Sequence, residues 1–336
     1  MNDDRIIRQR RLSHDAIQES LRRYIVDVHE TMRLVLVQED TDGNFQISVT
    51  DSGPKVLSLG TATSNGYKGV DIRGHCMLSN LLQELALAQE HGHKRIFLDK
   101  FRLTENHVDR LSRMISQTFW HNLTRRIDAD GLEKILLDPK NRSKSQHPCI
   151  FVPASEMRQI EYYEAFAKAN PQLNLTVEIL PKELTADYTR DLNEKPGLLA
   201  LEMKEIKDKN GSTKLQGVPF IVPGARFNEL YNWDSYFIAL GLVVDNMVEM
   251  AQGTVDHFIF EIKHYGKILN GNRTYYLMRS QPPFLTDMAL QVYSRLDPKN
   301  EIENRAWLKR AIQAAIKEYH TVWMAQPRLL RRMGTK

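Results

Sequence analysis

The chain has 336 residues, of which 42% are hydrophobic and 26% are charged, so it is long enough for about two globular domains with a sizeable core. This composition excludes a collagen-like, a wholly disordered and a disulfide-stapled chain. The net charge of +4, from 46 basic and 42 acidic residues, is too balanced to indicate nucleic-acid binding, which usually needs a clustered basic surface.

Cysteine content and apolar runs indicate the compartment in which the protein works. Its two cysteines, Cys76 and Cys149, are too few for a disulfide framework and favour a reducing compartment. No apolar run approaches the roughly 20 residues that span a bilayer, and the start MNDDRIIRQRR lacks the apolar segment of a secretory signal. We therefore expect a cytoplasmic protein that does not engage membranes or nucleic acid.

The first part of the chain alternates between arm, helix and turn patterns. Residues 1–12 carry four arginines and no core pattern, which predicts a disordered basic arm. Ser13 could cap a helix that extends to about Gln38, because apolar residues recur there at helical spacing. Residues 40–51 are polar and rich in turn formers, with a short β-like alternation from Phe45. Helical patterns return at about 71–91 and 104–127.

The second part is predicted to be helical after a mixed region. The basic, proline-bearing stretch DPKNRSKSQHP at 138–148 is the best linker candidate. Residues 149–225 mix short strands and helices, and the dipeptide Asn210-Gly211 predicts a hairpin turn. Further helices are expected at about 233–250, 254–268, 284–296 and 301–326. The chain is therefore predicted to be mainly α, with short β-hairpin insertions.

Ser13 is a candidate phosphorylation site. Arg10 and Arg11 stand three and two residues before it, a pattern that a basophilic kinase reads with its own carboxylates. A phosphate there would add about −1.5 to −2 charge and could dock into the arginine cluster of a 14-3-3-type phosphoserine-binding adaptor. The alternative is that Ser13 is only a helix N-cap beside a solvated basic run. The two interpretations are compatible, because phosphate is also favoured at a helix N-terminus.

The string DTDGNFQISVTD, residues 40–51, has the oxygen spacing of a twelve-residue calcium loop. Positions 1, 3, 5, 7, 9 and 12 of such a loop are filled here by Asp40, Asp42, Asn44, Gln46, Ser48 and Asp51. Gln46 would bind through its backbone carbonyl. Two positions depart from the usual loop, since Phe45 replaces the glycine at position 6 and Asp51 replaces the closing glutamate. The alternative is a polar turn that binds no metal.

The segment PGARFNELYNWDSY, residues 223–236, concentrates aromatic, arginine, amide and carboxylate side chains. Aromatic faces stack on sugar rings, and the polar groups hydrogen-bond to sugar hydroxyls, so the segment predicts a site for a polar, ring-shaped ligand. The alternative is a loop-to-helix junction built around a buried tryptophan.

This segment resembles the first signature of the trehalases, a glycoside hydrolase family, written P-G-G-R-F-x-E-x-Y-x-W-D-x-Y. Only Ala225 departs from it, in place of the second glycine. The strings DTDGNFQI, SGPKVLSLGTATSNGY, DIRGHCMLSNLLQEL and HNLTRRID, with the arginine–serine arm, are similar to the fungal neutral, cytosolic trehalases. The resemblance therefore covers nearly the whole chain, as the N-terminal portion of such a protein.

The resemblance implies a fold, an activity and a set of site residues. The fold would be part of an (α/α)6 toroid barrel at 70–336, preceded by a calcium-binding regulatory region at 13–69 and the arm at 1–12. The activity would be hydrolysis of α,α-trehalose to two glucose molecules with inversion. The implied calcium ligands are Asp40, Asp42, Asn44, Gln46 and Asp51, and Ser13 would be a regulatory phosphosite. The implied substrate contacts are Arg226, Trp233, Asp234, Asn270, Arg279, Ser280 and Gln281.

The sequence lacks the two catalytic motifs that the family resemblance leads us to expect. An inverting glycosidase needs a carboxylic acid and a carboxylate base about 6.5–9.5 Å apart. In the trehalases these lie in an E-S-G-x-D setting and after a Q-W-D-x-P signature, and neither string occurs here. We therefore assign no catalytic residue and expect this chain to bind trehalose without turning it over alone. The alternative function is a non-catalytic, calcium- and phosphoserine-dependent module that binds an adaptor.

Overall fold

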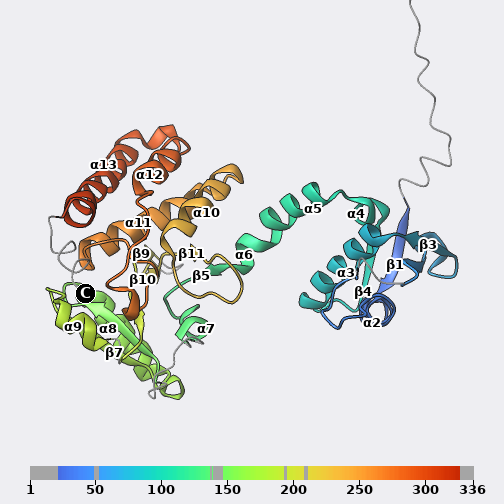
Figure 1. Ribbon diagram of the computed structural model, residues 1–336, viewed down its shortest axis with the longest axis horizontal. Coiled ribbons are helices and arrows are strands. Elements are labelled where there is room, and N and C mark those ends of the chain that lie inside the picture. The colour runs from blue at the N-terminus through green and yellow to red at the C-terminus, as the bar shows by residue number, and fades with distance from the viewer. Residues whose placement is uncertain are drawn as a thin grey trace, which may run out of the picture. The chain divides into compact units, whose positions relative to one another are not determined.

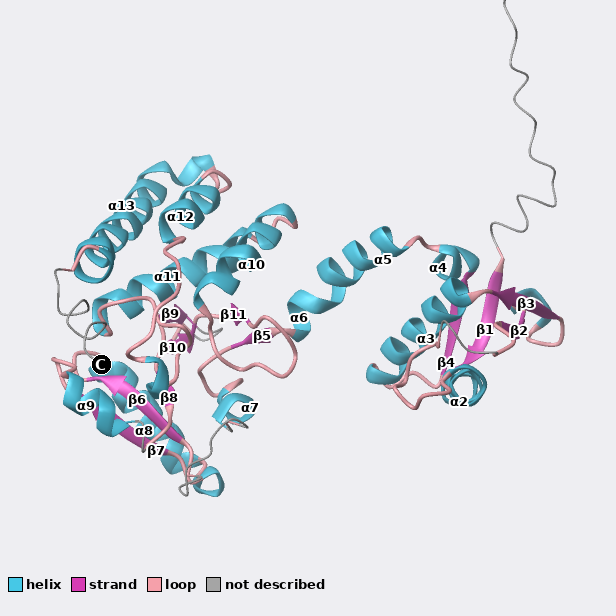
Figure 2. Ribbon diagram, in the orientation of Figure 1, coloured by secondary structure: helices cyan, strands magenta, loops and turns pink. Residues whose placement is uncertain are grey.

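The computed structural model of the protein describes residues 22–48, 53–136, 138, 147–192, 195–207 and 211–325. Ser13, Asp51 and most of the predicted linker lie outside these ranges, so their assignments stay predictions. Figure 2 shows a mainly helical chain with short strands, as the sequence predicts. Its contacts divide it into two compact units, Met1–Met114 and Ile115–Lys336. The boundaries predicted after residues 12 and 69 separate regions by function and not by contacts, and they stay a prediction.

The first unit contains two antiparallel strand pairs and several helices (Figure 1). β1 (Arg23–Asp27) pairs with β4 (Arg95–Asp99), and β2 (Val56–Gly60) pairs with β3 (Gly69–Arg73). The helices of this unit are α2 (Val28–Glu39), α3 (His75–Glu90), α4 (Lys100–Thr104) and α5 (His107–Met114), with a 3-10 turn at Ala62–Ser64. Leu78, Leu81 and Leu85 of α3 are fully buried and pack with apolar residues of α2 and the strands into one core.

Strand β1 replaces part of a predicted helix. The sequence predicts a helix from Ser13 to about Gln38, but residues 23–27 are extended and α2 begins only at Val28. Asp27 caps α2, because its Oδ1 accepts a hydrogen bond from the backbone N–H of Glu30 at 3.1 Å. The prediction is wrong here because the RYIVD sequence is also compatible with a strand, and pairing with the distant β4 selects the strand.

A second predicted helix, at 104–127, is shorter than expected. Helical structure begins at His107 in α5, continues through a π-helical turn at Ile115–Phe119 and ends with α6 (Trp120–Asn122). The chain then forms β5 (Thr124–Arg125), which pairs antiparallel with β11 (Phe220–Ile221). Likewise α3 starts later than the expected residue 71, because β3 occupies the residues before it.

The second unit holds a small parallel sheet that periodicity did not predict. β6 (Cys149–Pro153) lies between β7 (Thr176–Leu180) and β8 (Leu198–Leu199), and both neighbours run parallel to it. Helix α8 (Met157–Ala169) provides the crossover from β6 to β7. A separate antiparallel pair joins β9 (Met203–Lys207) to β10 (Thr213–Gly217). The other short elements are α7 (Leu132–Leu136), α9 (Ala186–Asp191) and a 3-10 turn at Pro171–Leu173.

Four further helices, α10 to α13, complete the described part of the second unit (Figure 1). They are α10 (Asn232–Val244), α11 (Val248–His264), α12 (Leu285–Tyr293) and α13 (Glu301–Glu318), with 3-10 turns at Thr274–Tyr276 and Pro298–Asn300 and a π-helical turn at Tyr319–Trp323. Leu242, Val255 and Met288 are buried where α10, α11 and α12 pack together. The helix predicted at 233–250 is wrong at its end, because Asn246 adopts a left-handed φ of 59° that breaks it before α11.

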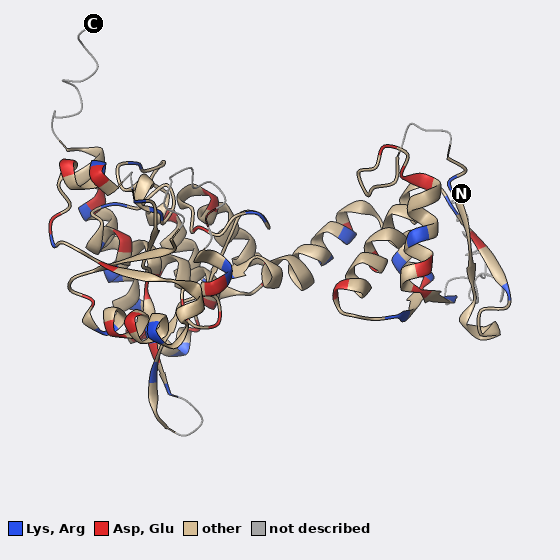
Figure 3. Ribbon diagram, turned by 90° about the horizontal axis from the view of Figure 1, so that it is seen from below, with Lys and Arg blue, Asp and Glu red and all other residues tan. Residues whose placement is uncertain are grey.

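The described residues show neither a segregation of charge nor a membrane-spanning helix. Acidic and basic positions are interspersed over both units (Figure 3). Among the helices that the structure describes, none is both long enough and apolar enough to cross a membrane.

Candidate calcium and sugar sites

The predicted calcium loop begins directly at the C-terminus of α2. Asp40 accepts two backbone hydrogen bonds with its carboxylate, from Asn44 N to Oδ1 at 3.0 Å and from Phe45 N to Oδ2 at 2.9 Å. These bonds turn the chain back over Asp40. The Nδ2 of Asn44 donates to Asp42 Oδ2 at 2.8 Å, and Asn44 Oδ1 accepts from Gln46 N at 2.9 Å. The structure therefore brings Asp40, Asp42 and Asn44 together.

Backbone conformation explains why this loop contains no strand among residues 41–48. Gly43 and Phe45 have left-handed φ values of 72° and 62°, so the predicted β-like alternation from Phe45 is wrong. The Phe45 side chain is 76% exposed, whereas Ile47 is buried. Phe45 thus takes, at the loop position where glycine is usual, the conformation that glycine would adopt most easily.

A buried ion pair closes the base of the loop and was missed by sequence reasoning. Glu39 is fully buried, and its carboxylate accepts from Lys55 twice, from the backbone N at 2.8 Å and from Nζ at 2.5 Å. Its backbone carbonyl accepts from Ser48 N at 3.0 Å. Glu39 precedes the ligand pattern by one residue, and its role depends on Lys55, which lies outside that pattern.

The donor chemistry of the loop fits a hard cation. Carboxylate and amide oxygens are the ligands that Ca²⁺ prefers, and the loop presents them on the half-buried Asp40 and the exposed Asp42 and Asn44. In the part of the chain that the structure describes, no three side chains of His, Cys, Asp and Glu gather as a metal centre. The loop depends instead on two carboxylates, an asparagine and backbone carbonyls, and its last predicted ligand, Asp51, lies outside the described residues.

The first predicted sugar segment leads into the N-terminus of α10. Trp233 and Asp234 lie in the first turn of this helix, and the Trp233 side chain is 43% exposed. The guanidinium of Arg226 lies over the Phe227 ring, 5.1 Å from the ring centre, in a cation–π contact. Ala225, the one departure from the trehalase signature, is not among the described residues with a positive φ, so an alanine fits there without strain.

The second predicted sugar segment, residues 270–284, which holds Asn270, Arg279, Ser280 and Gln281, is a loop that closes on itself. The backbone N of Asn270 donates to the carbonyl of Arg279 at 3.1 Å, and Ser280 Oγ donates to the carbonyl of Ile268 at 2.7 Å. Gln281 Oε1 accepts from the backbone N of Trp233 at 3.1 Å. The structure thus joins the two segments directly at Trp233 and Gln281, while Ser280 is occupied by the backbone of its own loop.

Two buried glutamates hold the chain just before Asn270. Glu318 Oε1 accepts from Ile268 N at 2.9 Å, and Glu261 Oε2 accepts from Leu269 N at 3.0 Å. Burial raises the pKa of both carboxyls, that of Glu261 well above its ordinary value. They are isolated acids on α11 and α13, and no local sequence signal could have identified them as supports of this loop.

Three carboxylates lie near the sugar segments, and their surroundings differ. Glu229 is buried and forms an ion pair with Arg273 at 3.1 Å. Asp287 Oδ2 accepts from the hydroxyl of Tyr236 at 2.7 Å, and this hydrogen bond raises the pKa of Tyr236. Asp234 lies in the first turn of α10, where a negative charge is favoured by the helix dipole. None of these observations assigns a catalytic role to any of the three.

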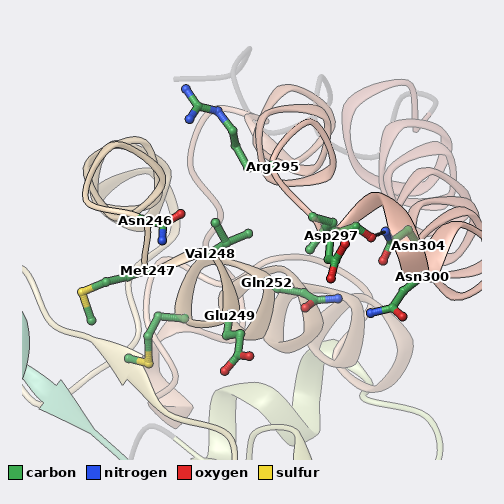
Figure 4. A pocket seen from close by; sticks show the side chains of 11 residues that line it. Asn246, Met247, Val248, Glu249, Gln252, Arg295, Asp297, Asn300 and Asn304 are labelled. Carbon is green, nitrogen blue, oxygen red and sulfur yellow. Dashed lines mark hydrogen bonds between the residues drawn. The ribbon is translucent and has the colours of Figure 1, made fainter.

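A cavity of about 500 Å³ lies elsewhere in the second unit (Figure 4). It is formed by the turn between α10 and α11, the start of α11, the connection from α12 to α13 and the start of α13. Its polar lining includes Asn246, Gln252, Arg295, Asn300 and Asn304. None of the predicted sugar-binding residues lines it, because they lie at the opposite ends of α10 and α12.

Comparison with known proteins identifies the family of the chain. Residues 89–336 match the family model for trehalase. The chain belongs to the trehalase family. Residues 32–61 match the neutral trehalase Ca²⁺ binding domain, which contains the loop from Asp40 onward. The chain therefore carries this calcium-binding domain, and the resemblance predicted from the trehalase signature is confirmed.

Individual trehalases are similar over nearly the whole chain. The cytosolic neutral trehalase of Emericella nidulans is 55% identical over 321 residues, which make up 95% of this chain and 42% of that protein. The cytosolic neutral trehalase of Saccharomyces cerevisiae is 51% identical over 319 residues, which make up 94% of this chain and 42% of that protein. The structure of neutral trehalase Nth1 from Saccharomyces cerevisiae superposes with a TM-score of 0.64 at 52% identity, covering 67% of this chain and 41% of that one. The chain thus spans less than half the length of these relatives.

Proposed function

We propose that this chain supplies the trehalose-binding and calcium-binding parts of a cytoplasmic, inverting hydrolase that converts α,α-trehalose to two glucose molecules. Its relatives are named cytosolic neutral trehalases, which supports both the substrate and the compartment. The structural observation that carries the proposal is the direct contact between the two sugar segments at Trp233 and Gln281.

In this proposal the sugar-binding residues have distinct roles. The exposed indole of Trp233 offers a face for a glucose ring, and the Asp234 carboxylate accepts hydrogen bonds from sugar hydroxyls. Arg226 and Arg279, both exposed, donate to hydroxyl oxygens. Asn270, Ser280 and Gln281 hold the second glucose unit or the loop that surrounds it.

We assign the catalytic acid and base to positions outside this chain. Inverting hydrolysis needs one carboxylic acid to protonate the glycosidic oxygen and one carboxylate to deprotonate the attacking water. Glu229 is a poor candidate for either role, because its carboxylate is buried and already paired with Arg273 and Tyr231. The helices α10 to α13 would then form part of an (α/α)6 toroid barrel, with the calcium-binding region at 13–69 before it.

Calcium would bind through Asp40, Asp42, Asn44, the carbonyl of Gln46 and Asp51. The ion would supply positive charge to a loop in which the Asp40 and Asp42 carboxylates accept hydrogen bonds from Asn44 and Phe45. Asp40, Asp42 and Asn44 hold the loop in a turn at the end of α2, next to the buried Glu39–Lys55 pair.

Phosphorylation of Ser13 by a basophilic kinase, followed by binding of a 14-3-3-type adaptor, would add regulation to this proposal. The second candidate function, a calcium- and phosphoserine-dependent adaptor module without trehalose affinity, rests on the same loop. Calorimetric titration of the Ser13-phosphorylated chain with the adaptor and with trehalose separates the two functions. Adaptor binding without measurable trehalose affinity would favour the second.

The sugar site is tested by titrating trehalose into the full chain. We expect Arg279→Ala to weaken binding roughly 10- to 100-fold, the usual effect of removing a charged hydrogen-bond donor. The matched control is Arg295→Ala, which removes an arginine from the cavity of Figure 4 and should leave trehalose affinity unchanged. Equal effects of the two variants would contradict the proposed site. Glucose release by the chain alone would contradict the assignment of acid and base to positions outside it.

A further inference from the structure

The two sugar segments lie alongside each other over three consecutive residues. Leu230 N donates to Asn272 Oδ1 at 2.8 Å, and Tyr231 forms an antiparallel bridge with Gly271. One residue earlier, Glu229 lies opposite Arg273. The two segments are thus antiparallel, with residues 229, 230 and 231 opposite residues 273, 272 and 271.

The second segment is itself anchored to the parallel sheet. Leu199 N of β8 donates to the carbonyl of Asn272 at 2.9 Å, and Asn272 Nδ2 donates to the carbonyl of Leu199 at 3.1 Å. Thr274 N donates to the carbonyl of Gly197 at 3.0 Å. Residues 271–274 therefore lie between β8 and the first sugar segment and contact both. The contacts between residues 229–231 and residues 271–273 then determine the position of Trp233 and Asp234.

One of these connections is a buried ion pair. Arg273 Nε donates to Glu229 Oε1 at 3.1 Å, and both side chains are only 2% exposed. The other Glu229 oxygen, Oε2, accepts from the Tyr231 hydroxyl at 2.8 Å, and Arg273 Nη2 donates to the carbonyl of Ile135 at 2.8 Å. Both charges are thus paired and hydrogen-bonded inside the protein, and any slip of one segment against the other would leave them unpaired.

Close packing around the pair leaves little room for a different alignment. A Cβ atom added at Gly271 would lie 3.1 Å from the Tyr276 ring and 3.4 Å from the Tyr231 ring. The rings of Tyr231 and Tyr276 also meet edge to face, with their centres 6.4 Å apart. The ion pair and the rings beside it therefore select one register between the two segments.

We propose that Glu229 and Arg273 are positioning residues, which set trehalose affinity by fixing the register of the two sugar segments without contacting the sugar. The inference rests on the proposed function, because it takes Arg226, Trp233 and Asp234 on one segment, and Asn270, Arg279 and Gln281 on the other, as trehalose contacts. In this arrangement Glu229 controls where Trp233 and Asp234 stand relative to Gln281.

The test compares two isosteric substitutions in the full chain, Glu229→Gln and Asp256→Asn. Asp256 is a matched control, since it is also largely buried, is paired with Lys204 at 2.6 Å and accepts from Trp307 Nε1 at 2.8 Å, but joins neither sugar segment. Trehalose affinity is measured by calorimetry and stability by thermal unfolding. We expect both variants to lower the Tm, and only Glu229→Gln to raise the Kd for trehalose, by at least about tenfold.

A double variant, E229L with R273M, keeps the inference testable if Glu229→Gln fails to fold. Replacing a buried ion pair by apolar side chains often leaves stability unchanged, so this variant should keep a Tm close to that of the unsubstituted chain. It should nevertheless lose at least about tenfold in trehalose affinity, since the charge pairing that selects the register is gone.

Each outcome bears on the proposal. Unchanged affinity in Glu229→Gln or in the folded double variant overturns the positioning role while the proposed function stands. An equal loss of affinity in Asp256→Asn at equal Tm also overturns it, because the effect would then follow stability alone. An unsubstituted chain that does not bind trehalose overturns both the proposed function and this inference.

Discussion

The calcium loop and the sugar site solve the same problem, the placement of several polar side chains, in different ways. The calcium loop draws its described ligands from one short stretch and holds them by exposed hydrogen bonds between neighbours, such as Asn44 to Asp42. The sugar site draws its residues from two separate segments and holds them by buried contacts, such as Glu229 to Arg273. A local site can form wherever its loop closes, whereas the sugar site exists only when the second unit is folded around it.

The largest expected effect tests whether the sugar site depends on its buried pair. Arg273→Ala removes one partner and leaves the Glu229 carboxylate buried without it, which should cost about 3–5 kcal/mol of unfolding free energy. Urea unfolding measures this loss. The matched substitution in the calcium loop, Asp42→Ala in calcium-free buffer, should cost about 0.5 kcal/mol or less, because Asp42 is exposed. Similar losses in the two variants would remove the contrast between the regions.

The next effect concerns the calcium loop itself. Asp40→Ala removes a predicted ligand and also the acceptor of the backbone hydrogen bonds from Asn44 and Phe45. We expect the calcium affinity to fall roughly 100-fold, measured by calorimetric titration. Thr41→Ala, in the same loop but outside the ligand set, serves as the control. If both variants lose the same affinity, the loop spacing does not identify the ligands.

The next prediction concerns the acid sensitivity of the second unit, which contains the buried His257. Burial lowers the pKa of His257 to about 3, with Nδ1 accepting from Glu202 N at 3.2 Å. Because the unfolded chain takes up this proton near the ordinary pKa of about 6.5, stability is full above that pH and is lost as the pH falls towards 3.

The corresponding measurement is the unfolding free energy of the unsubstituted chain and of His257→Gln at several pH values. Below about pH 6.5 the unsubstituted chain should lose roughly 1 kcal/mol per pH unit relative to the variant. Glu202 has the opposite effect, because burial raises its pKa to about 7 and its contribution to the stability of the protein falls as the pH rises. Both chains contain Glu202, so comparing them removes this contribution. Parallel pH profiles would show that His257 does not titrate on unfolding.

The smallest effect tests the left-handed residue in the calcium loop. Phe45→Gly relieves a φ of 62° that costs a non-glycine residue about 1–2 kcal/mol. Glycine also makes the unfolded chain more flexible, so ordering the loop costs more conformational entropy. We therefore expect a net gain in calcium affinity of about fivefold or less, with trehalose affinity unchanged. A large loss of calcium affinity would instead show that the exposed phenylalanine supports the bound state.

Sequence patterns predicted the helices that pack by a continuous apolar face. The helices expected near 284–296 and 301–326 correspond to α12 and α13, although α13 ends at Glu318. The helix expected near 254–268 corresponds to α11, which begins six residues earlier, at Val248. The same reasoning failed at β1, where Tyr24 fits the helical stripe but also alternates with Val26 as in a strand, and pairing with β4 decided the outcome. It also failed to predict the parallel sheet around β6, because the strands that pair there are separated by helix α8 and by loops.

For this protein, the sequence alone determined what depends on neighbouring residues. It predicted the turn of Asp40, Asp42 and Asn44, the helix beginning at the Trp233 segment, and membership of the trehalase family through short contiguous signatures. Tertiary structure alone decided how distant segments meet: Glu229 with Arg273, Trp233 with Gln281, and Glu318 with the backbone before Asn270. The physical reason is that these contacts join residues far apart in the sequence and leave no periodic pattern along the chain. The two that involve glutamate are also buried, and they gain their strength from the folded interior.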